Sequence, residues 1–156
     1  MSDKKYNFQK KVNEKKIAKA CKQNAPISTK YSVEFSNYFK NKPLDKAIKI
    51  CEDIINKEDH LPLKKYNKKV AHRKGDSKRG VASGRWPIKA ATTVKALLED
   101  VKANAENLNL DTEKLKIIHM FAVKGVTRRK TQPLGRTGGK QRESKSTNIE
   151  VIVLEE

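Results

Sequence analysis

The clearest alternation of apolar and polar residues lies in the last quarter of the chain, where two stretches predict β-strands. The first stretch covers residues 114–123 and repeats its apolar side chains at a period of two. These side chains are Leu115, Ile117, Phe121 and Val123, with His119 between them. A histidine on such a strand face is more often a satisfied core or boundary residue than a metal ligand.

The second stretch covers residues 147–154 and alternates Ile149, Val151 and Val153 with polar positions. One face of this strand is expected to be buried and the other to contact water, at least at its start. The two stretches therefore predict a pair of strands joined by a long connection, residues 124–145.

Two helices are predicted upstream of these strands from apolar residues that recur every three or four positions. The first covers residues 33–40, with Ser32 as its N-cap. The second runs from residue 44 to about residue 57, and its apolar stripe includes Cys51. The expected role of this cysteine is that of a small buried hydrophobe.

A third helix, from Pro87 to about residue 108, has the strongest helical period in the chain. Its apolar positions are Ile88, Ala91, Val94, Leu98, Val101, Ala105 and Leu108. Residues 25–29 are expected to form a short edge strand, where a proline is tolerated. The lysine-rich residues 1–24 have no sustained period, and we expect a tail that is flexible or ordered by a partner.

Charge follows the same division of the chain. The net charge of +18 indicates a polyanionic partner. Segments with a helix or strand period are close to neutral, whereas residues 1–30, 60–90 and 124–145 carry +7, +9 and +7. The sequence therefore predicts one domain, residues 25–156, that follows a basic N-terminal tail and includes a basic loop at residues 60–85.

The segment from 124 to 145 is expected to be a hairpin arm. Hairpin connections normally have two to five residues, and this one is far longer. It has little apolar surface on which to fold, so it is either disordered or a functional arm for a polyanion.

The sequence gives little support for catalysis. No Ser/His/Asp or Cys/His grouping is visible, and the acidic residues fall mostly on exposed faces of the predicted helices. The glycine-rich residues 135–140 lack the spacing of a phosphate-binding loop. The two cysteines lack metal-ligand spacing, and no apolar run is long enough to cross a membrane. We expect no enzyme, no cofactor and no membrane segment.

Lys and Arg in the unpatterned runs are the expected phosphate ligands, because Arg can bind a phosphate through two N–H groups. Tyr66 and Trp86 lie among basic residues, where their rings could stack on bases, with ordinary packing as the alternative. The candidate contacts in the loop are Lys64, Lys65, Tyr66, Arg73, Lys74, Lys78, Arg79, Arg85 and Trp86. Those in the arm are Arg128, Arg129, Lys130, Arg136, Lys140, Arg142 and Lys145.

Several stretches, in a fixed order, carry a resemblance to a known family. They include Leu61-Pro62-Leu63-Lys64-Lys65-Tyr66-Asn67, Gly84-Arg85-Trp86-Pro87-Ile88-Lys89-Ala90-Ala91, Arg128-Arg129-Lys130-Thr131 and Ile149-Glu150-Val151. Residues from about 25 to 156 resemble the universal large-subunit ribosomal protein twenty-two of the bacterial numbering, called protein seventeen in the eukaryotic numbering. The long loop before Trp86 resembles the archaeal and eukaryotic members, and the tryptophan itself leans eukaryotic.

The resemblance implies an α+β fold, with three helices packed on a small three-stranded antiparallel sheet and a long projecting β-hairpin. It implies a structural constituent of the cytosolic large ribosomal subunit, with ribosomal RNA and neighbouring ribosomal proteins as partners. The family's hairpin reaches the wall of the exit tunnel, so its tip would meet the nascent peptide. Arg128, Arg129, Lys130 and Arg136 would contact RNA along the arm. A cytoplasmic location, with nucleolar passage during assembly, is also implied.

Two other classes of protein fit parts of the pattern. A free-standing basic protein that binds DNA or RNA as an architectural component would show the same charge distribution. A nuclease would need a carboxylate cluster, and none is visible in the sequence.

Overall fold

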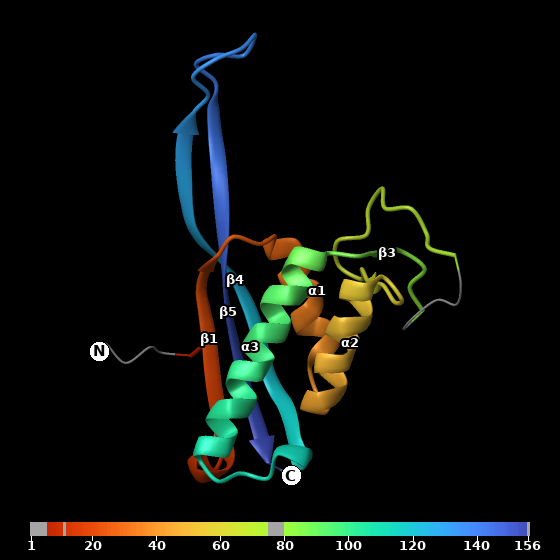
Figure 1. The fold of residues 1–156 in the computed structure, drawn as a ribbon, viewed down its shortest axis with the longest axis vertical. Helices are drawn as coiled ribbons and strands as arrows, with labels where there is room; N and C mark the ends of the chain where they lie inside the picture. Colours follow the sequence, from red (N-terminus) through yellow and green to blue (C-terminus); the bar gives the residue numbers. More distant parts are fainter. Residues whose placement is uncertain (1–5, 11, 75–79, 156) are drawn as a thin grey trace.

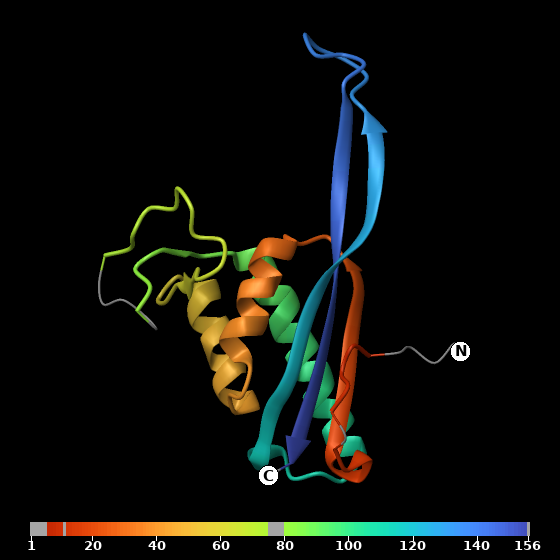
Figure 2. The ribbon, with the colours of Figure 1, turned by 180° about the vertical axis from the view of Figure 1, so that it is seen from behind.

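A three-stranded antiparallel sheet forms the centre of the protein, with β5 between β1 and β4 (Figure 1). The computed structural model describes residues 6–10, 12–74 and 80–155. The strands are β1 (Ile17–Ala25), β4 (Leu115–Thr131) and β5 (Gln141–Glu155). Seen from behind, β4 and β5 continue together beyond the body, whereas β1 stops at its edge (Figure 2).

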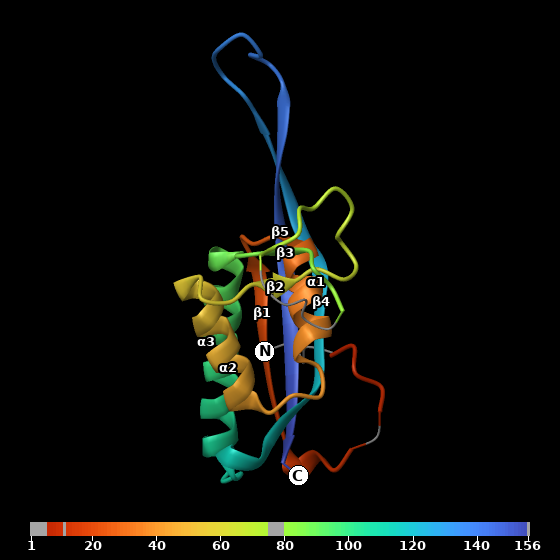
Figure 3. The same ribbon diagram turned by 90° about the vertical axis from the view of Figure 1, so that its right-hand side faces the viewer.

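Three helices cover one face of this sheet: α1 (Thr29–Phe39), α2 (Leu44–Asn56) and α3 (Ile88–Asn107) (Figure 3). The helix α3 packs against β1 and α2, and α1 packs against β4. The core between the layers is apolar, and its fully buried members include Phe35, Phe39, Leu44, Ile54, Leu98, Ile117 and Ile149. The predicted α+β fold is confirmed.

The first helix begins earlier than the sequence pattern predicts. Its N-cap is Ser28, whereas Ser32 lies inside the helix and is fully buried. The Ser32 hydroxyl donates to the Ser28 carbonyl at 3.0 Å, so its polar group is satisfied one turn back along the helix. The second helix ends as expected, and Cys51 is fully buried, which raises the pKa of its thiol.

The predicted tail is wrong for residues 17–24, which form most of β1. This strand pairs with β5 from Ile17 opposite Leu154 to Ala25 opposite Thr147. Its buried side chains are mostly alanines, which are depleted in strands, so the segment gives a weak sequence signal. Ala25 ends this strand, and residues 25–29 do not form a separate one.

Residues 6–8 lie across the sheet face opposite the helices (Figure 3). The Asn7 N–H donates to Glu150 Oε1 at 2.9 Å, and the Phe8 ring lies 5.3 Å from that of His119. Burial, together with the neighbouring Cys21 and Glu150, raises the pKa of Tyr6 to about 12. Glu150, expected on the wet face, is therefore buried.

A bulge in β4 reverses the faces that its sequence pattern predicts. The pairing with β5 shifts between Ile117 and His119, and one extra residue moves each later side chain to the other face. Beyond the bulge the buried side chains are Met120 and Ala122, while Phe121 and Val123 are 42% and 43% exposed. His119 is a boundary residue as expected, since its Nε2 lies 2.9 Å from Glu150 Oε1.

The arm is a continuation of the sheet. The pairing of β4 and β5 runs out to Thr131 opposite Gln141, so only residues 132–140 form the tip. The segment buries neither face, which is why it shows no apolar alternation. The basic loop also contains short strands, β2 (Leu61–Pro62) and β3 (Gly84–Arg85), which pair with each other.

The packing of α3 predicts unequal effects of two substitutions. Leu98 is fully buried, so Leu98→Ala should lower the free energy of unfolding by about 2–5 kcal/mol. Lys95 forms solvent-accessible ion pairs with Glu52 at 2.9 Å and Glu99 at 3.6 Å, so Lys95→Ala should cost much less. Chemical denaturation measures both, and equal losses would contradict this phase of the helix.

Candidate nucleic-acid interface

A buried carboxylate holds the most basic part of the loop. Glu34 of α1 is 2% exposed and accepts backbone N–H groups of three consecutive residues. Its oxygens lie 3.2, 2.8 and 2.7 Å from the nitrogens of Lys64, Lys65 and Tyr66. Hydrogen bonds to an ionised carboxylate are short and strong, so this backbone segment is fixed in place.

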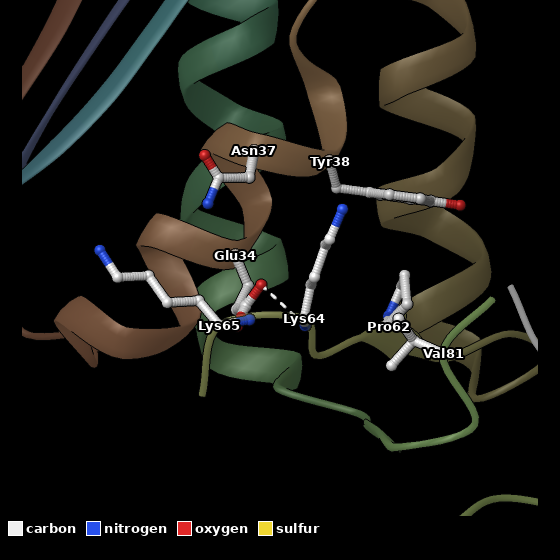
Figure 4. A pocket seen from close by; sticks show the side chains of 7 residues that line it. All are labelled: Glu34, Asn37, Tyr38, Pro62, Lys64, Lys65 and Val81. Carbon is white, nitrogen blue, oxygen red and sulfur yellow. Dashed lines mark hydrogen bonds between the residues drawn. The ribbon is translucent and has the colours of Figure 1, made fainter. Parts of the chain in front are cut away.

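The side chains of this segment remain available to a partner. Lys64 and Lys65 are exposed, and Tyr66 is half-buried. Figure 4 shows the two lysines leaving the segment in different directions, with Lys64 extending toward Tyr38 and Lys65 away from it. Positive charge is thus presented on both sides of a rigid backbone.

Two arginines of the loop, Arg73 and Arg85, make hydrogen bonds within the loop itself. Arg73 Nε donates to the Gly84 carbonyl at 2.9 Å, and its guanidinium lies 4.2 Å from the centroid of the Trp86 ring. Arg85 donates to the carbonyls of Ala71 and Gly84 at 3.2 and 2.8 Å. A guanidinium carries five N–H donors, so both arginines keep donors for phosphate while they stabilise the loop.

Close packing explains one glycine of the loop. A Cβ at Gly84 would overlap Cδ2 of His60, so only glycine fits beneath this ring. Burial and the nearby Arg73 lower the pKa of His60. Its neutral form therefore stabilises the fold above the unfolded pKa of about 6.5, and this contribution is lost as the pH falls toward the folded pKa.

The arm has two faces of different charge. Side chains of paired strands alternate between faces, and directly opposed residues share one. Lys130 lies opposite Arg142, and Arg128 lies opposite Ser144. We call Arg128, Lys130 and Arg142 the basic face of the arm. In the paired segments 127–131 and 141–145, this face carries no acidic side chain.

The second face of the arm is partly neutralised. Arg129 lies opposite Glu143, and Lys145 Nζ lies 3.9 Å from Glu143 Oε2.

On the basic face the like charges of Lys130 and Arg142 oppose each other, which is unfavourable without an anion. The Arg142 guanidinium also donates to Gln132 Oε1 at 2.8 and 3.1 Å. An anion is therefore most favourable on the basic face.

A cluster of hydrogen bonds joins the arm to the body where β4 has its second bulge. Asn24 Oδ1 accepts from the Val126 N–H at 3.1 Å and from the Ser146 hydroxyl at 3.2 Å. The Asn24 N–H donates to Asn148 Oδ1 at 2.7 Å. A Cβ at Gly125 would lie 2.6 Å from Ser146 Oγ and 2.7 Å from Asn24 Oδ1. We call these residues, 24, 125, 126, 146 and 148, the arm clasp.

The structure groups the predicted contacts into a loop set and an arm set. The loop set surrounds β2 and β3, and the arm set lies along the projecting ribbon and its tip (Figure 1). Arg136 and Lys140 are exposed at the tip, and Lys74 is exposed in the loop. Lys78 and Arg79 lie outside the described residues.

The residues that position these groups were not predicted from the sequence. For Glu34 the sequence offers one indication that it lies near the buried side of its helix, since it precedes the aromatic Tyr38 by one turn. The residues of the arm clasp gave none, because they come from distant parts of the sequence.

Two further kinds of feature are absent from the part of the chain that the structure describes. No group of three or more His, Cys, Asp or Glu side chains in residues 6–10, 12–74 and 80–155 is arranged to hold a metal ion. Over the same residues, no helix has both the length and the apolar character needed to cross a membrane.

Comparisons with known proteins agree with the fold. A family model described as ribosomal protein L22p/L17e matches residues 20–154. Large ribosomal subunit protein uL22 of Methanosphaera stadtmanae is 39% identical over 150 residues, which cover 96% of each chain. The protein of the same name from Methanocaldococcus jannaschii is 40% identical over 153 residues, covering 97% of this chain and 94% of its own.

A third relative, large ribosomal subunit protein uL22 of Ignicoccus hospitalis, is 38% identical over 144 residues, covering 92% of this chain and 91% of its own. The resemblance seen in the sequence is confirmed, and these relatives belong to the archaeal branch. These archaeal relatives do not support the interpretation that Trp86 indicates a eukaryotic member of the family.

The arm clasp predicts that Gly125 is intolerant of a methyl group. Gly125→Ala would push Ser146 and Asn24 apart, and crowding of this kind costs about 1–3 kcal/mol. The free energy of unfolding should fall by that amount, and NMR shifts should change at the amides of Val126 and Asn24.

The matched control is Ser144→Ala, which removes an exposed hydroxyl from the same ribbon. This variant should keep the stability and the amide shifts of the unchanged protein. Indistinguishable results for the two variants would show that the clasp does not constrain the arm.

Proposed function

The chain belongs to the ribosomal protein L22p/L17e family, and we propose that it binds ribosomal RNA in the large subunit through its basic loop and its arm. Members of this family are structural ribosomal proteins, so the expectation that the chain is not an enzyme is confirmed. The relatives' name supports a structural role in the large subunit and a cytoplasmic, ribosome-associated location.

The observation that carries the RNA-binding proposal is the basic face of the arm. Three cations project from a ribbon that stands clear of the body, and two of them oppose each other. Such a face is destabilising alone and favourable beside a phosphate chain, because each Lys or Arg then neutralises a phosphate and releases counterions. The loop contributes Lys64 and Lys65 on a backbone that needs no reordering.

The length of the arm supports its extension toward the nascent-peptide exit tunnel. Its tip holds Leu134, which is 81% exposed and is therefore available to a passing peptide. Neighbouring ribosomal proteins are proposed as further partners of the body. Nucleolar passage during assembly stays a prediction that applies only to a cell with a nucleus.

Retention on the particle tests the role against the alternative of a free-standing architectural protein. A component of the large subunit is held by many simultaneous contacts, so it should remain with large subunits through a high-salt wash and sedimentation. A free-standing protein that binds phosphates non-specifically should be released, because such binding weakens steeply with salt. Release into the supernatant would contradict the proposed role.

The two faces of the arm predict different salt dependence for two charge-matched variants. Replacing Arg128 and Lys130 by Gln removes two phosphate ligands from the basic face. The slope of log affinity against log salt should fall by roughly 0.7–0.9 for each lost contact. The measurement is the binding of the full chain to large-subunit ribosomal RNA over a series of salt concentrations.

The control replaces Arg129 and Lys145 by Gln, which removes the same charge from the face that contains Glu143. Its slope should change less. Equal changes in the two variants would show that the arm does not present one face to RNA.

A further inference from the structure

A cavity lies beside residues 64–66, the backbone segment that donates hydrogen bonds to Glu34. Its volume is about 440 Å³, within the range of about 300–1,000 Å³ typical of small-molecule sites. The helix α1 contributes Lys30 and Tyr31 to its wall, and the loop contributes Lys65, Tyr66 and Lys68. This cavity is distinct from the one in Figure 4, although Lys65 borders both.

The lining of the cavity offers the two kinds of contact that bind a nucleotide: aromatic rings for its base and ammonium groups for its phosphate. Tyr31 and Tyr66 are half-buried, and the buried Leu63 adds an apolar surface to the wall of the cavity. The three lysines of the cavity are exposed at its edge. Aromatic rings stack on unpaired bases of either RNA or single-stranded DNA, and ammonium groups neutralise phosphates.

The positions of the lysines favour a phosphate close to a stacked base. The ammonium groups of Lys30 and Lys65 lie 5.8 and 5.6 Å from the centroid of the Tyr66 ring. These distances are near the outer limit of about 6 Å for a cation–π contact, so the contacts are weak. A base can therefore stack on the face of the Tyr66 ring while the ammonium groups of Lys30 and Lys65 contact the phosphate of the same nucleotide.

The buried carboxylate of Glu34 prepares this site in advance. The Glu34 carboxylate accepts the backbone N–H groups of Lys65 and Tyr66 at 2.8 and 2.7 Å. These hydrogen bonds fix the position of the backbone from which the Tyr66 side chain extends. A site that is already ordered loses less conformational entropy on binding. Glu34 is thus a positioning residue for the cavity.

We propose that this cavity binds one unstacked nucleotide of the ribosomal RNA, with its base on Tyr66 and its phosphate among Lys30, Lys65 and Lys68. The inference rests on the proposed function, because it assigns one site within that RNA interface. An acidic peptide would satisfy the lysines but would leave the two rings without a stacking partner, so a nucleotide fits the lining better.

The test separates stacking from charge. The full chain is titrated with large-subunit ribosomal RNA over a series of salt concentrations, and ultraviolet crosslinks are mapped to single residues. Tyr66→Leu should weaken binding roughly 5- to 150-fold, the range that corresponds to the loss of one base stack. Its salt slope should not change, because no charge is removed. Tyr66→Phe keeps the ring and should bind as the unchanged protein does.

Two controls keep the result specific. Phe121→Leu removes an aromatic ring that is 42% exposed on β4, outside the cavity, and should leave RNA affinity unchanged. Amide hydrogen exchange at Lys65 and Tyr66 should remain slow in Tyr66→Leu, which shows that Glu34 still holds the loop. Crosslinks to a nucleotide are expected at Tyr66 or Tyr31.

The outcomes distinguish this proposal from the broader one. If the unchanged protein shows no salt-dependent binding to the RNA, the proposed function fails. If it binds, and Tyr66→Leu binds equally well, the nucleotide site is overturned and the RNA-binding role stands. Equal affinity combined with loss of a neighbouring protein from the subunit would assign the cavity to a protein partner and would also overturn the proposal.

Discussion

The pairing of β5 with both β1 and β4 is the interaction on which the rest of the structure depends. The C-terminal half of β5 builds the core, where Ile149, Val151 and Val153 are at most 1% exposed. Its N-terminal half forms one side of the arm. Thr147 marks the junction, since it is fully buried and its hydroxyl donates to the Ile27 carbonyl at 2.9 Å. The arm is therefore anchored by the same strand that organises the body.

The distribution of charge follows from this division. Two lysines of α3 have acidic partners on α2: Lys95 lies 2.9 Å from Glu52, and Lys102 lies 2.8 Å from Asp45. Among the residues that the structure describes, the cations of the loop and of the basic face of the arm have no such acidic partner. A net charge of +18 repels itself in a compact body, and a polyanion relieves this repulsion where the charge is most exposed. Folding and binding thus use different parts of the chain.

Periodicity in the sequence was enough to predict the helices and the buried part of β5, because burial on one face leaves a regular pattern. It failed for β1, whose buried side chains are mostly small, and for β4 beyond Ile117, where a bulge reverses the faces. The pairing within the arm left no pattern, because the arm buries neither face.

The candidate site was predictable in composition but not in geometry. The basic residues of the loop and the arm are visible as charge, whereas their arrangement depends on contacts between distant residues. Glu34 meets Tyr66 across 32 positions, and Asn24 meets Val126 across 102. Such contacts depend on the packing of the whole domain, so a local sequence pattern does not predict them.

We expect RNA to lie against the loop and the basic face of the arm, and not against the surface where ion pairs join α2 and α3. The most direct measurement is a cryo-electron microscopy map of the particle with which the protein co-purifies. We expect a large ribosomal subunit in which RNA contacts Lys64, Lys65 and the residues of the basic face. RNA packed against Lys95 and Lys102, with the loop and the arm in solvent, would contradict it.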